Sequence, residues 1–83
     1  MRSKAKPKQG PHQRLAEAIR RRRKALRLNQ TEAAALAGCN RLFVSEVESG
    51  KQTVRLDKLL DLLDALGYQL ALENGKHRLE IHE

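Results

Sequence analysis

Apolar residues recur along the chain with two different spacings, which divide it into a helical part and a strand-like end. From residue 11 to residue 66 they recur every three or four positions, as on one face of an α-helix. From residue 68 onward they recur at every second position, as in a strand with one buried face. The pattern predicts a mainly α-helical fold of four to five helices, followed by a C-terminal β-strand or hairpin.

Residues 29–50 predict two short helices joined by a tight turn. Asn29 is a favourable N-cap residue and Glu32 follows three places later, so the pair can satisfy two backbone N–H groups reciprocally. Gly38 is expected to end this helix, because glycine adopts the left-handed conformation at little cost. Asn40 is then placed to cap a second helix, which is expected to end before the next glycine.

The second of these helices has an apolar face and an exposed face. Val44 and Val47 share the apolar face. The side chains that point elsewhere are Arg41, Leu42, Ser45 and Glu46. A short helix with exposed polar groups in its first turns is suited to enter the major groove of DNA. An ordinary helical hairpin inside a small bundle is the alternative interpretation of this spacing.

Two stretches carry a family resemblance. GCNRLFVSEVESGK, preceded by LRLNQTEAAALA, resembles the Xre (Cro/C1-type) class of helix-turn-helix proteins, and the resemblance covers residues 14–67. It implies a lambda-repressor-like fold and binding to a DNA operator. The basic segment IRRRRKAL and the later ALGYQLALE resemble HipB-like antitoxins in particular, in which the terminal strand contributes to a dimer. The narrower resemblance implies a dimeric repressor that is also the antitoxin of a HipA-like kinase toxin and regulates its own operon.

The resemblance also assigns roles to individual residues. It implies that five residues face the bases: Asn40, Arg41, Leu42, Ser45 and Glu46. Three others are expected near the phosphate backbone: Asn29, Gln30 and Lys51. Arg23 is expected to pair with Glu48, which would join the first helix to the third. Among the base-facing residues Arg41 is the strongest candidate, because a guanidinium can donate two hydrogen bonds to one guanine.

Two arginines depart from the family pattern. Arg22 interrupts the apolar stripe of the first helix, so its aliphatic stem is expected along the core with its charged head in water. Arg27 stands where relatives commonly have glycine, at the end of that helix. A residue with a Cβ in a left-handed cap costs about 1 kcal/mol, so either the chain leaves the helix differently or the strain is tolerated.

The C-terminal segment predicts a hairpin. Asn74-Gly75 is a strong two-residue turn signal, and such a turn would place Leu70 opposite Leu79. The apolar residues expected on one shared face are Tyr68, Leu70, Leu72, Leu79 and Ile81. A lone hairpin needs that face covered, so we expect it to serve in dimerisation, either as an intrachain hairpin or as a strand paired with its copy across a two-fold axis.

Charge is distributed unevenly. Residues 1–27 carry eleven Lys or Arg against one Glu, whereas residues 28–83 carry six against nine acidic residues. This asymmetry favours double-stranded DNA as partner over a membrane surface, which would need an apolar complement. We expect residues 1–10 to form a disordered basic arm, which either follows DNA or is a solvated tail. Residues 11–67 are expected to form the DNA-binding domain, and residues 68–83 the dimerisation segment.

Other classes of function find little support. Catalytic arrangements, cofactor motifs and clustered metal ligands are not recognisable, so we expect no enzyme, no cofactor and no metal. The single Cys39 is interpreted as a small buried residue. The sequence has neither an apolar stretch of about 18 residues nor a signal-peptide pattern, so a cytoplasmic, nucleoid-associated protein is expected. A stand-alone Xre-type regulator and an interaction module without specific DNA binding stay open as alternatives.

Overall fold

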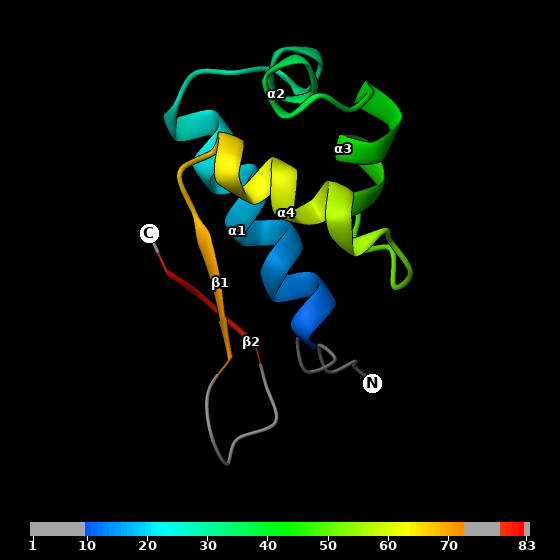
Figure 1. The fold of residues 1–83 in the computed structure, drawn as a ribbon, viewed down its shortest axis with the longest axis vertical. Coiled ribbons are helices and arrows are strands. Elements are labelled where there is room, and N and C mark those ends of the chain that lie inside the picture. Colours follow the sequence, from blue (N-terminus) through cyan, green and yellow to red (C-terminus); the bar gives the residue numbers. More distant parts are fainter. Residues whose placement is uncertain (1–9, 73–78, 83) are drawn as a thin grey trace, which may run out of the picture.

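A computed structural model describes residues 10–72 and 79–82. It contains four helices and a two-stranded antiparallel sheet (Figure 1). These elements are α1 (Pro11–Ala25), α2 (Gln30–Ala37), α3 (Arg41–Glu48), α4 (Leu56–Ala65), β1 (Gln69–Leu72) and β2 (Leu79–His82). The predicted mainly α-helical fold with a C-terminal hairpin is confirmed, and the described residues contain no fifth helix.

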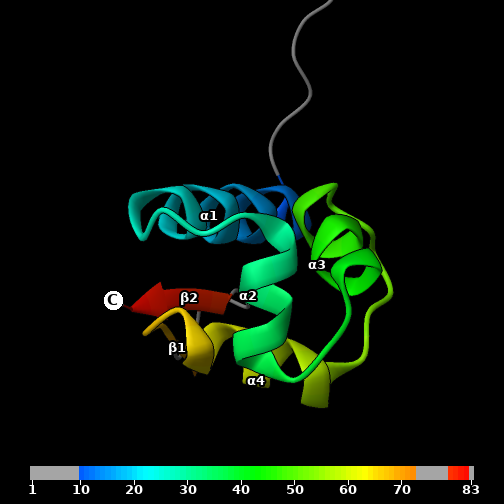
Figure 2. The same cartoon turned by 90° about the horizontal axis from the view of Figure 1, so that it is seen from above.

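The helices surround one core, with α3 and the hairpin at opposite ends. Seen from above, α1 and α4 form two facing sides and α2 runs between them (Figure 2). β1 continues from α4 and contacts it, whereas β2 lies beside α1. No helix of residues 10–72 and 79–82 is long and apolar enough to cross a membrane.

The core is formed by small residues of α2 and by larger apolar residues of the other helices and of the segment before β1. Its largest fully buried side chains are Ile19, Val44, Leu62, Leu63 and Leu66. Only part of the leucine face of α4 contributes, since Leu56 and Leu60 are 60% and 44% exposed. The arc of apolar residues on α4 is therefore wider than the core of the chain can cover.

The predicted caps of α2 and α3 are present. Asn29 Oδ1 accepts a hydrogen bond from the backbone N–H of Glu32 at 2.7 Å, and Glu32 Oε1 accepts one from the backbone N–H of Asn29 at 2.8 Å. Gly38 has φ 74° and ends α2. Asn40 Oδ1 accepts from the backbone N–H of Phe43 at 2.9 Å and starts α3. Side chains and one glycine thus fix the length of both helices and the turn between them.

Arg27 adopts the left-handed conformation, with φ 61°. Of the two alternatives for this position, the strained one is therefore realised. The turn is held by two backbone hydrogen bonds, from Arg27 N–H to the Lys24 carbonyl at 2.9 Å and from Leu28 N–H to the Arg23 carbonyl at 3.1 Å. These bonds keep the residue in a conformation that glycine would adopt more readily.

The expectation that the head of Arg22 lies in water is wrong. Its Nε donates to the backbone carbonyl of Leu66 at 2.8 Å, and its guanidinium carbon lies 5.6 Å from the centroid of the Tyr68 ring. The carbonyl of Leu66, the C-cap residue of α4, accepts this hydrogen bond, and the face of the ring attracts a cation. Arg22 therefore fastens α1 to the end of α4 and to the residue before β1.

The hairpin register differs from the predicted one by two residues. Leu70 lies opposite Ile81 and Leu72 opposite Leu79, within one chain. The predicted register assumed a two-residue turn at Asn74-Gly75, which lies outside the described residues. A shift by two keeps every side chain on its predicted face, so the alternating apolar pattern alone could not distinguish the two registers.

Tyr68 belongs to the core of its own chain. Its side chain is 7% exposed and joins the main hydrophobic cluster, whereas Leu70 is half-buried against that cluster. Of the residues predicted for dimerisation, Tyr68 is thus already covered without a second copy. The side chains of Leu72, Leu79 and Ile81 are not among those described.

Candidate nucleic-acid interface

α3 presents one polar side to solvent and buries the other. Arg41 and Leu42 are exposed, as is the capping residue Asn40, while Ser45 and Glu46 are half-buried. The buried side consists of Phe43, Val44, Val47 and Glu48. The structure therefore brings all five residues predicted to face bases to the exposed side of α3 or to its N-cap. Phe43 was not predicted for the buried side, although its spacing of four residues from Val47 places it on the same face of the helix.

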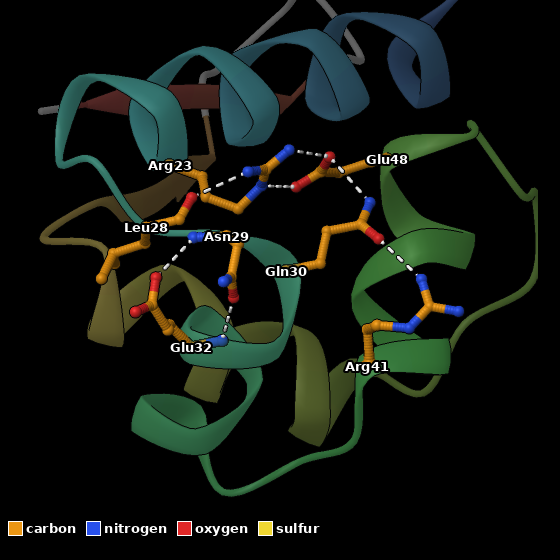
Figure 3. A network of polar contacts seen from close by, with 7 residues as sticks. All are labelled: Arg23, Leu28, Asn29, Gln30, Glu32, Arg41 and Glu48. Carbon is orange, nitrogen blue, oxygen red and sulfur yellow. Dashed lines mark hydrogen bonds and ion pairs between the residues drawn. The ribbon is translucent and has the colours of Figure 1, made fainter.

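A buried ion pair joins α1 to α3 behind this surface (Figure 3). Arg23 Nε donates to Glu48 Oε2 at 2.6 Å, and Arg23 Nη2 donates to Glu48 Oε1 at 2.9 Å. The two side chains are 11% and 5% exposed. Arg23 Nη1 also donates to the carbonyl of Leu28 at 2.8 Å, which anchors the connection between α1 and α2. All three nitrogen atoms of the Arg23 guanidinium thus donate hydrogen bonds.

The ion pair is charged because its hydrogen bonds outweigh its desolvation. Burial by itself raises the pKa of Glu48, but hydrogen bonds from Arg23 and Gln30 and the nearby charges of Arg23 and Arg20 hold that pKa below its ordinary value. The hydrogen bond to Glu48 raises the pKa of Arg23. Both groups therefore carry full charge at neutral pH.

Gln30 connects this pair to the exposed face of α3 (Figure 3). Its Nε2 donates to Glu48 Oε1 at 3.2 Å, and its Oε1 accepts from Arg41 Nη1 at 3.1 Å. Because the carboxylate of Glu48 can only accept, the amide group of Gln30 must turn its oxygen toward Arg41. Arg41 is consequently held by a chain of contacts that starts in α1. No local sequence signal shows this contact, since Gln30 and Arg41 are eleven residues apart.

The other edge of α3 borders a hollow of about 270 Å³. Phe43 and Val54 form apolar parts of its wall, and three cations surround it: Lys51, Arg55 and Lys58. Lys51 Nζ lies 3.4 Å from Glu46 Oε2, and Arg55 is paired with Asp57 at 2.6 Å. Arg55 and Lys58 were not predicted as site residues, although they are two of the few cations in the otherwise acidic part of the sequence.

The phosphate-directed residues predicted from the resemblance lie on both sides of α3. Asn29 and Gln30 stand at the start of α2, and Lys51 follows the end of α3 after Ser49 and Gly50. The Oδ1 of Asn29 is used by the cap of α2, and Gln30 makes the two contacts described above.

The described residues contain no group of three or more His, Cys, Asp or Glu able to hold a metal ion. Burial raises the pKa of the half-buried Cys39 thiol.

Two capped short helices at a tight turn, with the polar side of the second exposed beside Lys51, Arg55 and Lys58, have the arrangement of a helix-turn-helix domain. The sequence matches the helix-turn-helix domain family over residues 14–75, which is more than half of the chain. The protein therefore belongs to the helix-turn-helix domain family and is by class a DNA-binding regulator. A search of curated proteins gives no match.

Proposed function

We propose that the protein is a sequence-specific transcriptional repressor that reads the major groove with α3. The observation that carries this proposal is the placement of Arg41, which is exposed at the first turn of α3 and bonded to Gln30. A guanidinium held in one orientation loses less side-chain freedom when it binds a base than a free one does. The contact chain from Glu48 through Gln30 to Arg41 thus supports a role in reading and not only in attraction.

The DNA contact proposed for each exposed residue follows from the chemistry of its side chain. Arg41 donates two hydrogen bonds to guanine O6 and N7, and Leu42, which is 60% exposed, contacts a thymine methyl group. Asn40, Ser45 and Glu46 complete the base-facing set. Asn29, Gln30 and Lys51 act on phosphates and set the register, as do the two cations beside the hollow, Arg55 and Lys58.

We further propose that the repressor acts as a two-fold dimer. Support comes from the exposed Leu56 and Leu60 of α4 and from the small size of the core, both of which favour burial against a second copy. Such a dimer would bind a palindrome whose half-site centres lie about 34 Å apart, one turn of DNA. The HipB-like resemblance of the sequence extends the proposal to an antitoxin that binds a HipA-like kinase toxin and represses its own operon.

The test begins with duplexes selected by the protein from a random library. Binding of the selected duplex and of a scrambled one is followed by fluorescence anisotropy at about 50 and 200 mM salt. Arg41→Ala should weaken binding to the selected duplex by about 5- to 150-fold, the value of one good bidentate base contact, and leave the scrambled duplex nearly unaffected. Lys51→Ala is the matched control and should weaken both duplexes alike.

Two outcomes would redirect the proposal. Equal losses on both duplexes for Arg41→Ala would make this residue a phosphate contact. Absence of any selected sequence would favour an interaction module that neutralises a partner without specific DNA binding.

The antitoxin role is tested separately, by copurification with the product of the adjacent reading frame. A repressor that binds its palindrome but copurifies with no kinase would be a stand-alone regulator.

A further inference from the structure

The exposed side of α1 carries cations that the proposed reading face does not use. Arg20 and Lys24 lie one helical turn apart, and Arg27 follows in the turn after α1. We call these three residues the basic flank. All three are exposed, and none forms a side-chain hydrogen bond or ion pair within the described part of the chain. Apart from the effect of the Arg20 charge on Glu48, these charges have no partner within the described residues.

The basic flank lies on the side of α1 that adjoins α3. Gln13, two helical turns before Arg20, lies so near the end of α3 that a Cβ built on Gly50 would be 3.6 Å from its Nε2. The charge of Arg20 also acts on Glu48 of α3, whose pKa it lowers. From Arg20, whose charge acts on Glu48 at the end of α3, the flank leads toward the C-terminal end of α1 and the connection to α2, at whose start Asn29 and Gln30 stand (Figure 2).

Arg27 stands at a position where its backbone is strained. It is the one described residue other than glycine with positive φ. Its turn is fixed by the bond of Leu28 N–H to the Arg23 carbonyl and by the bond of Arg23 Nη1 to the Leu28 carbonyl. Glycine would fit this turn with less strain, and the exposed side chain of Arg27 forms no hydrogen bond or ion pair with residues 10–72 or 79–82 that would compensate. The strain at Arg27 is therefore not offset by a contact of its side chain with the described residues.

We propose that the basic flank, Arg20, Lys24 and Arg27, binds DNA phosphates outside the base pairs that α3 reads. The inference rests on the proposed function, since it places the flank along the DNA that α3 enters. The row spans about 10 Å, and each DNA strand presents one phosphate per about 3.4 Å of axis, so the flank can meet at most three phosphates. The flank before α2 and the cations around the hollow beside α3 then offer positive charge at two separate places of the helix-turn-helix.

The salt dependence of binding tests this assignment. The triple variant Arg20→Gln, Lys24→Gln, Arg27→Gly and the wild type are titrated with the selected duplex and with a random-sequence duplex of equal length. The slope of log affinity against log salt should decrease in magnitude by about 2 to 3 in the variant, roughly 0.9 for each phosphate that the protein no longer neutralises. The ratio of the two affinities should stay the same, because phosphates carry no sequence information.

Arg21 provides a matched control within the same run of arginines. It is exposed, adjacent to Arg20 and turned by about 100° around the helix, so Arg21→Gln removes the same charge from another side. Arg20→Gln should change the slope by about one unit and Arg21→Gln by clearly less. Equal slopes for wild type and triple variant, or equal effects of the two single substitutions, would overturn the inference and favour an acidic protein as the partner of the flank.

Arg27 is tested by two substitutions that separate charge from strain. Arg27→Gly should raise the melting temperature by roughly 4–8 °C while weakening DNA binding. Arg27→Lys keeps the charge and should retain affinity without the gain in stability. A more stable Arg27→Gly with unchanged affinity would overturn the role of this residue. If the wild type bound no duplex, the proposed function would fail as well; if it bound and only these effects were absent, the flank alone would be wrongly assigned.

Discussion

Replacing Glu48 by glutamine should destabilise the protein severely, because it leaves the charge of Arg23 buried without its partner. Both side chains are almost covered, at 11% and 5% exposed, and are joined by two hydrogen bonds of 2.6 and 2.9 Å. Solvent screens such a pair little, so removal of one partner costs about 3–5 kcal/mol. A chain of 83 residues has a total stability of about 4–12 kcal/mol at typical values per residue. The substitution should therefore remove about a quarter or more of it.

Urea unfolding followed by far-ultraviolet circular dichroism measures this loss. With a slope of about 1–3 kcal/mol per molar urea, the midpoint of Glu48→Gln should fall by at least about 1 M. The double variant Arg23→Met, Glu48→Leu removes both charges and should recover much of the lost stability, because apolar residues of similar volume can replace a buried pair. Glutamine at 48 fills nearly the same volume, so a loss in the single variant reports charge and not packing.

Asp57→Asn is the control, because it breaks an ion pair of the same length at the surface. Arg55 Nη2 lies 2.6 Å from Asp57 Oδ2, yet the two side chains are 69% and 64% exposed. Surface pairs contribute little because water screens them, so this variant should unfold like the wild type. If Glu48→Gln lost no more stability than Asp57→Asn, the argument from burial would be refuted.

Three further predictions concern pH, capping and a turn. Because the pKa of Glu48 is lower in the folded than in the unfolded protein, the stability from this carboxylate is present above about pH 4.3 and is lost as pH falls through the folded pKa. Urea midpoints measured between pH 7 and pH 3 should show this decrease in stability. The contribution of Glu48 to the decrease should be absent in Glu48→Gln. Asn29→Ala removes a capping hydrogen bond of 2.7 Å and should lower stability by about 1 kcal/mol in thermal unfolding, with Asn29→Ser close to wild type. Gly67→Ala should lower the melting temperature more than Gly38→Ala: both glycines have positive φ, but a Cβ at Gly67 would lie 3.1 Å from Arg22 Nη2 and one at Gly38 meets nothing within 4 Å.

The parts of the fold that depend on local chemistry could be predicted from the sequence. Asn29 with Glu32 and Gly38 define α2 through caps that involve only near neighbours, and the structure contains each of them. The helical period of the α4 leucines predicted which side of the helix is buried. It did not predict where along that side the core ends. Leu56 and Leu60 are exposed because nothing in the described chain lies against that part of α4.

The parts that depend on distant contacts could not be predicted. In the sequence Arg22 interrupts an apolar stripe. The carbonyl that accepts its hydrogen bond lies at the end of α4, 44 residues away in the sequence. The bond between Gln30 and Arg41 likewise depends on how α2 and α3 cross. The Arg23–Glu48 contact was implied by resemblance to a family and not by the spacing of these two residues. The hairpin shows the same limit in another form, because a period of two fixes the faces of a strand and leaves shifts by two undecided.

The two alanines at the centre of α2 have a consequence for how the domain fits its target. Ala33 and Ala34 are 0% and 2% exposed, so α2 packs close against its neighbours, and the N–H of Cys39 ties the turn back to the Ala34 carbonyl at 2.9 Å. Close-packed contacts of this kind deform little, so α2 and α3 move as one rigid body. In the proposed complex with DNA, adjustment of shape would then come from the duplex. Base pairs that no side chain touches would influence the choice of site through the ease with which they bend or narrow a groove.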